Sequence, residues 1–308
     1  MQIKQRRRAA IWGFIVGDAV GVPYEFSERE LMKQNPAVEM IGYGTHNQPI
    51  GTWSDDTSML LCVVENLMNK GTLTDLANLF TKWYKHGHHT AHGEIFDIGN
   101  TTQIAIEKLI EGIHPTKSGE IHEYSAGNGS LMRCLPYAYE PDFKLSMIKM
   151  LLDNRITHKT TICNECCLFY TKVHQALILG KNKEESVKEG INTLKPLQHS
   201  FNELFSKEEN RFLDNFKRLY SDQFKHIPES DIQSTGYVLH TLEAVIWCFL
   251  NSKSYSESVL KAINLGGDTD TIAALTGGLA GSHYGYDSIP NNWIKKIARK
   301  NDLKKLIE

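Results

Sequence analysis

The sequence predicts an all-α protein, and three observations support this fold class. Apolar residues recur at intervals of three or four over most of the chain, as they do on one face of a helix. Residues 59–68, MLLCVVENLM, are apolar almost all the way round, which is typical of a central, buried helix. No convincing series of alternating strand patterns is present. We therefore expect a single compact domain of orthogonally packed helices over residues 1–308.

The expected helices follow from this spacing. They lie near residues 5–18, 59–68, 72–85, 101–111, 128–138, 145–155, 158–179, 183–193, 207–218, 234–250, 255–264, 270–281 and 291–299. The connections are rich in Gly, Pro, Asn and Asp, and none is long and biased enough to be an interdomain linker.

Composition excludes several classes of function. With 41% hydrophobic residues, 23% charged residues and a formal charge of -2, the chain is typical of soluble proteins, and we expect neither a nucleic-acid nor a membrane partner. The N-terminal basic and apolar segments superficially resemble a secretory signal, but Asp18 interrupts the apolar run. The six cysteines are expected to be reduced core thiols, so a cytoplasmic location is expected.

Two carboxylates stand inside the apolar stretch GGDTDTIAAL, residues 266–275. A buried carboxylate without a partner costs several kcal/mol, so Asp268 and Asp270 indicate a bound cation or shifted pKa values. The helix that follows contains Gly277, Gly278 and Gly281, each unfavourable in a helix interior, so we expect another backbone to approach it closely.

A second acidic stretch, GTWSDDTSM, precedes the buried helix at 59–68. Ser54, Asp55, Asp56 and Thr57 can act as a helix N-cap, but a cap needs only one such side chain. If the two acidic helix starts meet, their oxygens can hold a pair of Mg²⁺ or Mn²⁺ ions. Glu25, which follows a glycine-rich turn, can join them or be an ordinary surface glutamate.

A third stretch, SAGNGSLMRCLP, has Gly127 and Gly129 on either side of Asn128. Glycines let a backbone come close to a ligand, and free N–H groups at a helix start bind phosphate. An ordinary helix-starting turn has the same appearance. The four histidines of HGHHTAH, residues 86–92, are expected to be solvated on a loop rather than to bind a metal.

Together these stretches resemble the ADP-ribosylglycohydrolase family, which includes dinitrogenase reductase-activating glycohydrolases and ADP-ribosylarginine hydrolases. The matching pieces, in the family's order, are GDAVGVPYEF, GTWSDDTSM, FDIGNTT, GNGSLMRCLP, THKTTICNECC and GGDTDTIAALTGGLAG, spanning residues 13–281. The resemblance implies an all-α fold with two Mg²⁺ or Mn²⁺ ions at the bottom of an ADP-ribose cleft.

The resemblance also implies roles for individual residues. The implied metal ligands are Ser54, Asp55, Asp56, Asp268, Asp270 and Thr271, with Ser54 standing where threonine is common in the family. The implied substrate contacts are Gly127, Asn128, Gly129, Ser130, His158 and Tyr237. From spacing alone His158 is a core histidine on the helix 158–179, and Tyr237 is an aromatic residue on a buried helix.

The expected reaction is metal-dependent release of ADP-ribose from a modified protein. Glu25 and Asp97 are the acid/base candidates, and Asp97 resembles an aspartate of the arginine-directed members, which favours an arginine linkage. Carboxylates suit the oxocarbenium-like state of sugar cleavage. Alternatives are hydrolysis of serine-linked or other O-linked ADP-ribose, a metal-dependent phosphohydrolase, and a non-catalytic ADP-ribose-binding module. A monomer is expected.

Overall fold

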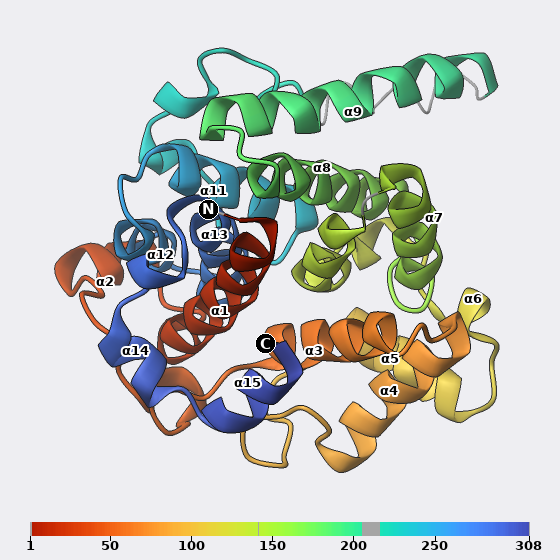
Figure 1. Cartoon of the computed structure of the whole chain (residues 1–308), viewed down its shortest axis with the longest axis horizontal. Helices are drawn as coiled ribbons and strands as arrows, with labels where there is room; N and C mark the ends of the chain where they lie inside the picture. The colour runs from red at the N-terminus through yellow and green to blue at the C-terminus, as the bar shows by residue number, and fades with distance from the viewer. Residues whose placement is uncertain (1, 141, 205–215, 308) are drawn as a thin grey trace.

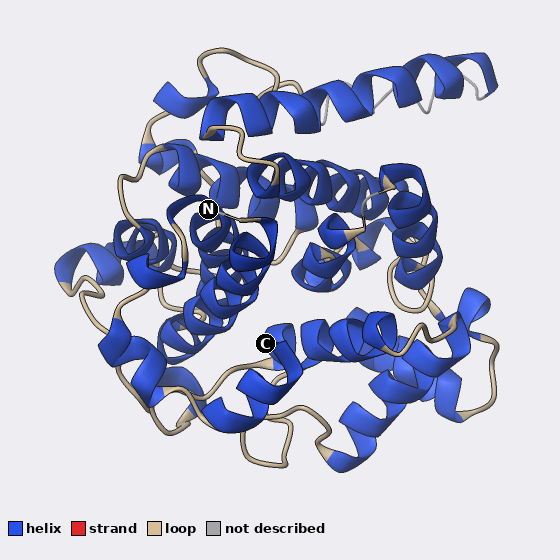
Figure 2. Cartoon of the chain, in the orientation of Figure 1, coloured by secondary structure: helices blue, strands red, loops and turns tan. Residues whose placement is uncertain are grey.

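All regular structure in the described part of the chain is helical (Figures 1 and 2). This computed structural model describes residues 2–140, 142–204 and 216–307, and these ranges contain isolated β-bridges but no strand. The α-helices are α1 (Ile3–Gly21), α2 (Arg29–Gln34), α3 (Asp55–Met68), α4 (Leu73–His86), α5 (Asn100–Ile110), α6 (Pro115–Ser118), α7 (Phe143–Asn154), α8 (Thr161–Ile178), α9 (Lys183–Leu204), α11 (Val238–Leu250), α12 (Tyr255–Asn264), α13 (Thr269–Tyr284), α14 (Asn291–Lys296) and α15 (Lys300–Ile307). The all-α prediction is confirmed.

The first helix and a late helix cross with their backbones in contact. A Cβ atom added to Gly17 of α1 would lie 2.2 Å from the carbonyl oxygen of Ala273 in α13. One added to Gly277 would lie 2.3 Å from the carbonyl oxygen of Gly13. The expectation that another backbone approaches the glycines of α13 is therefore confirmed, and the close approach explains why glycine is retained there despite its low helix propensity.

The other helices surround this pair. Helix α9 lies across α8 at one side of the molecule, and α3, α4 and α5 form the opposite side, where α15 also lies (Figure 1). Helix α3 is buried on nearly all sides, as its apolar sequence predicts. No helix in the described ranges is both long and apolar enough to cross a bilayer. All six cysteines are buried, free thiols.

Several expected helices differ from the structure, including those at 183–193 and 234–250, which are α9 (Lys183–Leu204) and α11 (Val238–Leu250). Residues 128–138 form two 3₁₀ segments, η4 (Asn128–Arg133) and η5 (Leu135–Tyr139), because Pro136 has no N–H group to continue an α-helix. The helix expected over 158–179 begins only at Thr161, because Thr160 caps it by accepting a hydrogen bond from the Cys163 N–H. Most of the helix expected over 207–218 lies outside the described residues.

Candidate active site

The two acidic helix starts meet in the structure. Ser54 caps α3, and its Oγ lies 3.0 Å from Oδ2 of Asp56. Thr271, in the first turn of α13, donates from Oγ1 to the same Oδ2 across 3.2 Å. A buried carboxylate oxygen is thus shared by hydroxyls from both ends of the sequence. The other oxygen, Oδ1 of Asp56, is buried and has no hydrogen-bond partner.

A second group of carboxylates lies between α13 and the segment after α1. One oxygen from each of Glu25, Asp268 and Asp270 lies within 4.8 Å of the others. Backbone hydrogen bonds hold the two segments together, since the Phe26 N–H donates to Gly267 O at 2.7 Å. Gly267 has φ +73°, a left-handed conformation that glycine adopts without strain. Oδ1 of Asp268 is buried and unpartnered, like that of Asp56.

The electrostatics of this cluster call for a positive charge. Burial, followed by repulsion from neighbouring carboxylates, raises the pKa of Asp55, Asp56 and Asp270 well above the usual range. A divalent cation would relieve both causes and use the unpartnered carboxylate oxygens. The donors are carboxylates and hydroxyls, the ligand set of hard cations such as Mg²⁺ and Mn²⁺. The residues present therefore fit such ions.

Glu25 also belongs to another group beside this cluster. Its other members are His46 and Asp97. Nε2 of His46 contacts Oε2 of Glu25, which raises the pKa of the imidazole. Burial raises the pKa of Glu25 to about 7, although the contact with His46 opposes this shift. Burial also raises the pKa of Asp97. The rings of Phe26 and Phe96 both lie near His46, with centroids 6.0 and 5.2 Å from that of the imidazole.

The glycine-rich loop is attached directly to the acidic cluster. Nδ2 of Asn128 donates to Oδ2 of Asp268 at 2.6 Å. Gly127 forms an antiparallel bridge with Tyr237, whose side chain is 36% exposed. A Cβ atom added to Gly129 would lie 2.7 Å from Cε1 of His158, so the loop packs closely on that ring. Five sequence-predicted substrate residues therefore lie together, beside the candidate metal ligands.

The expected position of His158 needs correction, whereas the predicted substrate contact of Ser130 stays a prediction. His158 is not on the face of a helix; it lies ahead of α8, and its Nδ1 lies 2.9 Å from Oγ1 of Thr157. Burial lowers its pKa to about 3, so the imidazole is neutral. Ser130 is fully buried, and its hydroxyl accepts a hydrogen bond from the Cys167 thiol. Its side chain is thus engaged inside the protein.

The sequence did not predict that Asp18 or His46 belongs to the site. Asp18 is fully buried on α1 and accepts hydrogen bonds from the backbone N–H groups of Ser54, at 3.0 Å, and Thr57, also at 3.0 Å. It therefore fixes the start of α3. Its signal was the same as that of Asp268, an acid inside an apolar run. His46 gave no comparable signal, because it lies in a polar loop 21 positions from Glu25.

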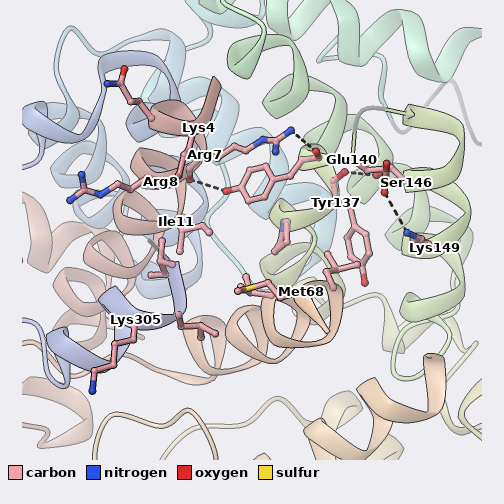
Figure 3. A pocket seen from close by; sticks show the side chains of 17 residues that line it. Lys4, Arg7, Arg8, Ile11, Met68, Tyr137, Glu140, Ser146, Lys149 and Lys305 are labelled. Atoms are coloured by element: carbon pink, nitrogen blue, oxygen red, sulfur yellow. Dashed lines mark hydrogen bonds and ion pairs between the residues drawn. The ribbon is translucent and has the colours of Figure 1, made fainter. Parts of the chain in front are cut away.

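Of two cavities in the described part of the protein, the smaller one lies at the candidate site. A small cavity of about 10 Å³ has both Asp55 and Asp97 in its wall, which joins the start of α3 to the segment before α5. A larger cavity of about 760 Å³ lies at the first turns of α1, where Figure 3 shows the side chains of Lys4, Arg7 and Arg8. The Tyr139 hydroxyl donates to the Arg7 carbonyl oxygen at 3.0 Å. None of the candidate site residues lines this larger cavity.

Comparisons with known proteins agree with this architecture. The family model for ADP-ribosylglycohydrolase matches residues 1–308. ADP-ribosylarginine hydrolase Tri1 of Pseudomonas putida (strain GB-1) is 33% identical over all of this chain and 78% of its own length. ADP-ribosyl-[dinitrogen reductase] glycohydrolase of Rhodospirillum rubrum is 29% identical over 97% of this chain and 92% of its own.

A solved structure extends the comparison to the fold. It is described as an ADP-ribosylglycohydrolase-related protein complex, and it superposes with a TM-score of 0.79 and 28% identity over 99% of this chain and 96% of its own. The match of the family model over residues 1–308 and the 33% identity to a curated relative are decisive. The chain belongs to the ADP-ribosylglycohydrolase family.

Proposed function

We propose that this protein removes ADP-ribose from modified protein side chains by hydrolysing the N-glycosidic bond between C1 of the distal ribose and a guanidino nitrogen of arginine. The observation that carries the proposal is the convergence of carboxylate oxygens of Glu25, Asp268 and Asp270 within 4.8 Å, beside the shared oxygen of Asp56. Family membership supports hydrolysis of an ADP-ribosyl linkage, and the named activities of relatives support an arginine linkage.

The proposal includes two divalent cations, Mg²⁺ or Mn²⁺. The residues that would hold them are Ser54, Asp55, Asp56, Asp268, Asp270 and Thr271. Bound there, the cations would orient the ribose hydroxyls and lower the pKa of a bound water. The protein contributes ligands that are already oriented, since Asp56 is fixed through Oδ2 by Ser54 and Thr271 and keeps Oδ1 free.

Glu25 and Asp97 are the proposed proton-transfer residues. In the reaction the water oxygen bonds to C1, the C1–N bond breaks, one carboxyl accepts a proton from water, and the departing guanidino nitrogen is protonated. A group transfers protons best when its pKa is near the working pH, and burial raises the pKa of Glu25 to about 7. Carboxylates beside the ring also stabilise the positive charge that develops on the sugar.

The surroundings of Asp97 support a cationic leaving group. Asp97 and Glu25 offer negative charge next to His46, and the rings of Phe26 and Phe96 lie near that histidine. A guanidinium group pairs well with carboxylates and stacks on aromatic faces. A serine hydroxyl would gain little from either contact. The glycine loop around Asn128 is the proposed contact for the diphosphate and ribose.

The test is time-resolved release of free ADP-ribose from matched arginine-linked and serine-linked peptides, with Mg²⁺, with Mn²⁺ and with a chelator. We expect metal-dependent release from arginine, lost in Asp55→Asn and Asp270→Asn and retained in the exposed control Asp222→Asn. Release from serine alone would overturn the proposed linkage. Release that persists with chelator and in both variants would overturn the metal mechanism, and binding of ADP-ribose without release would favour a binding module.

A further inference from the structure

A second group of possible metal ligands lies outside the acidic cluster. It consists of Glu65, near the end of α3, and two histidines of the loop that follows α4, His88 and His89. Nε2 of His88 lies 2.8 Å from Oε2 of Glu65, and Nε2 of His89 lies 2.6 Å from the same oxygen. From the sequence these two histidines were expected to be solvated, but both side chains are mostly buried and contact Glu65.

This group is separate from the proposed catalytic centre. Asp55 and Glu65 are ten positions apart on one helix, which corresponds to about 15 Å along its axis. The donor set also differs, since two imidazole nitrogens and one carboxylate oxygen suit Zn²⁺ rather than Mg²⁺. The site does not depend on the proposed reaction.

The geometry needs little adjustment to hold an ion. All three donor atoms lie within 4.8 Å of one another. A tetrahedral zinc with bonds of about 2.0–2.1 Å separates its ligand atoms by roughly 3.3 Å, so the carboxylate has to withdraw by only a fraction of an ångström. The side chains of Glu65, His88 and His89 are 26%, 19% and 15% exposed, so an ion can reach them. His89 also lines a cavity of about 250 Å³.

The charges around the group also suit a cation. Glu65 contributes a carboxylate, and its Oε2 lies within hydrogen-bond distance of Nε2 of both imidazoles. The nearby positive charge of Arg299 is balanced by Asp302, which lies 3.2 Å from its Nε.

The loop is held in the conformation that aims both rings at Glu65. His89 has φ +61°, a left-handed conformation that a residue other than glycine keeps only when its surroundings enforce it. Nε1 of Trp53 donates to the His89 carbonyl oxygen at 2.9 Å. This hydrogen bond attaches the loop to Trp53, the residue just before the N-cap of α3. The same loop continues to Asp97.

We propose that Glu65, His88 and His89 form a zinc site, with water as fourth ligand, that fastens the loop after α4 to helix α3. The ion would attach the chain segment leading to Asp97 to the helix whose first turn carries Asp55. Its role is structural, because the site lies about 15 Å from the proposed reaction centre.

The test is zinc affinity, measured by competition with a chromophoric chelator in excess Mg²⁺. We expect the parent protein to bind one Zn²⁺ tightly, and His88→Gln, His89→Asn and Glu65→Gln each to weaken binding at least about 100-fold. Asparagine tolerates the left-handed conformation of residue 89, which limits misfolding. His86→Gln, at the last residue of α4, is the matched control, and Asp270→Asn removes a candidate ligand of the acidic cluster; both should retain the tight zinc.

A second measurement uses cobalt in place of zinc in the unaltered protein. Four-coordinate Co²⁺ with imidazole ligands gives intense visible absorption, whereas the six-coordinate ion expected at an oxygen-only centre absorbs weakly. An intense spectrum that disappears in His89→Asn supports the site. Weak absorption in the parent protein, or equal zinc affinity in the parent, His88→Gln and His89→Asn, would show that the two imidazoles only hydrogen-bond to Glu65 and would overturn the proposal.

Discussion

Asn128 and Asp268, which are 140 positions apart in the sequence, are joined by a hydrogen bond of 2.6 Å from Nδ2 to Oδ2. The same amide group donates to Oγ1 of Thr241 at 3.0 Å, and the Asn128 N–H donates to the Gly236 carbonyl oxygen at 3.0 Å. The glycine-rich loop therefore orients an acidic side chain of the candidate metal centre and leaves its Oδ1 without a partner. A substitution in the loop is therefore expected to change metal affinity as well as substrate binding.

The first prediction follows from this bond. Asn128→Ala should weaken Mn²⁺ binding about 10- to 100-fold, because partners that orient a ligating carboxylate have effects of this size. Asn128→Asp removes the same amide donor but adds a negative charge that attracts the cation, so its affinity should fall less than that of Asn128→Ala. Calorimetric titration with Mn²⁺ measures both. Unchanged affinity in both variants would mean that Asp268 is not a ligand.

The sequence predicted those parts of the fold that depend on local pattern. The apolar spacing identified α3 and α13, and the glycines of α13 predicted that another backbone approaches it closely; in the structure this is the backbone of α1. The two acidic stretches were recognised because carboxylates inside apolar runs are costly wherever they lie. Such features are independent of which segment eventually packs against them.

The unpredicted parts depend on tertiary contacts. The sequence shows Asp18 as an acidic residue in an apolar helix. That it accepts a hydrogen bond from the Ser54 N–H is known only from the structure, because the two residues lie in segments that belong to different helices. The prediction that His88 and His89 are solvated was wrong because their partner Glu65 is 23 positions before His88, and no local sequence pattern indicates this contact. Helical spacing likewise cannot detect that Thr160 caps α8 and leaves the preceding residues outside it.

The second prediction concerns the packing of the glycine-rich loop. In Gly129→Ala the new Cβ would lie 2.7 Å from Cε1 of His158 and 2.9 Å from Oγ1 of Thr102, so a buried ring has to move. We expect a loss of about 1–3 kcal/mol in the free energy of unfolding and a raised KM. Gly127→Ala is the matched control, because its nearest neighbour is Nε2 of His158 at 3.5 Å, an ordinary contact. Urea denaturation and steady-state kinetics compare the two; equal behaviour would contradict the prediction.

The third prediction concerns Asp18, which accepts hydrogen bonds from the N–H groups of Ser54 and Thr57. In Asp18→Asn an amide NH₂ replaces one acceptor and faces a backbone donor, which should cost about 1–3 kcal/mol of stability. Because Ser54 begins the candidate metal-binding turn, Mn²⁺ affinity should fall as well. Asp75→Asn is the control: Asp75 caps α4 by accepting from the Thr72 N–H at 2.7 Å, away from the cluster, so it should lose stability but keep Mn²⁺ affinity. Loss of Mn²⁺ affinity in both variants would refute a local role.

The last prediction concerns Glu165, a glutamate on α8 that is 4% exposed and whose Oε1 has no hydrogen-bond partner. Burial raises its pKa from 4.5 to about 8. Between these two values the unfolded chain releases a proton that the folded protein keeps, so this residue lowers stability as pH rises through that window. By pH 8 the loss should amount to roughly 3–5 kcal/mol. Glu165→Gln should therefore be more stable than the parent at pH 8 and nearly equal to it at pH 5.

Urea denaturation of both proteins at several pH values between 5 and 8 measures this difference directly. The exposed Glu111→Gln is the control and should leave the pH dependence of the parent unchanged. Tyr220 provides a second readout, because burial and the charge of Glu165 raise the pKa of its phenol to about 12. Removing that charge should lower the phenol pKa in an alkaline absorbance titration. If Glu165→Gln and the parent lose stability in parallel from pH 5 to pH 8, then Glu165 is ionised in the folded protein and a partner for its charge must be sought on the facing helices.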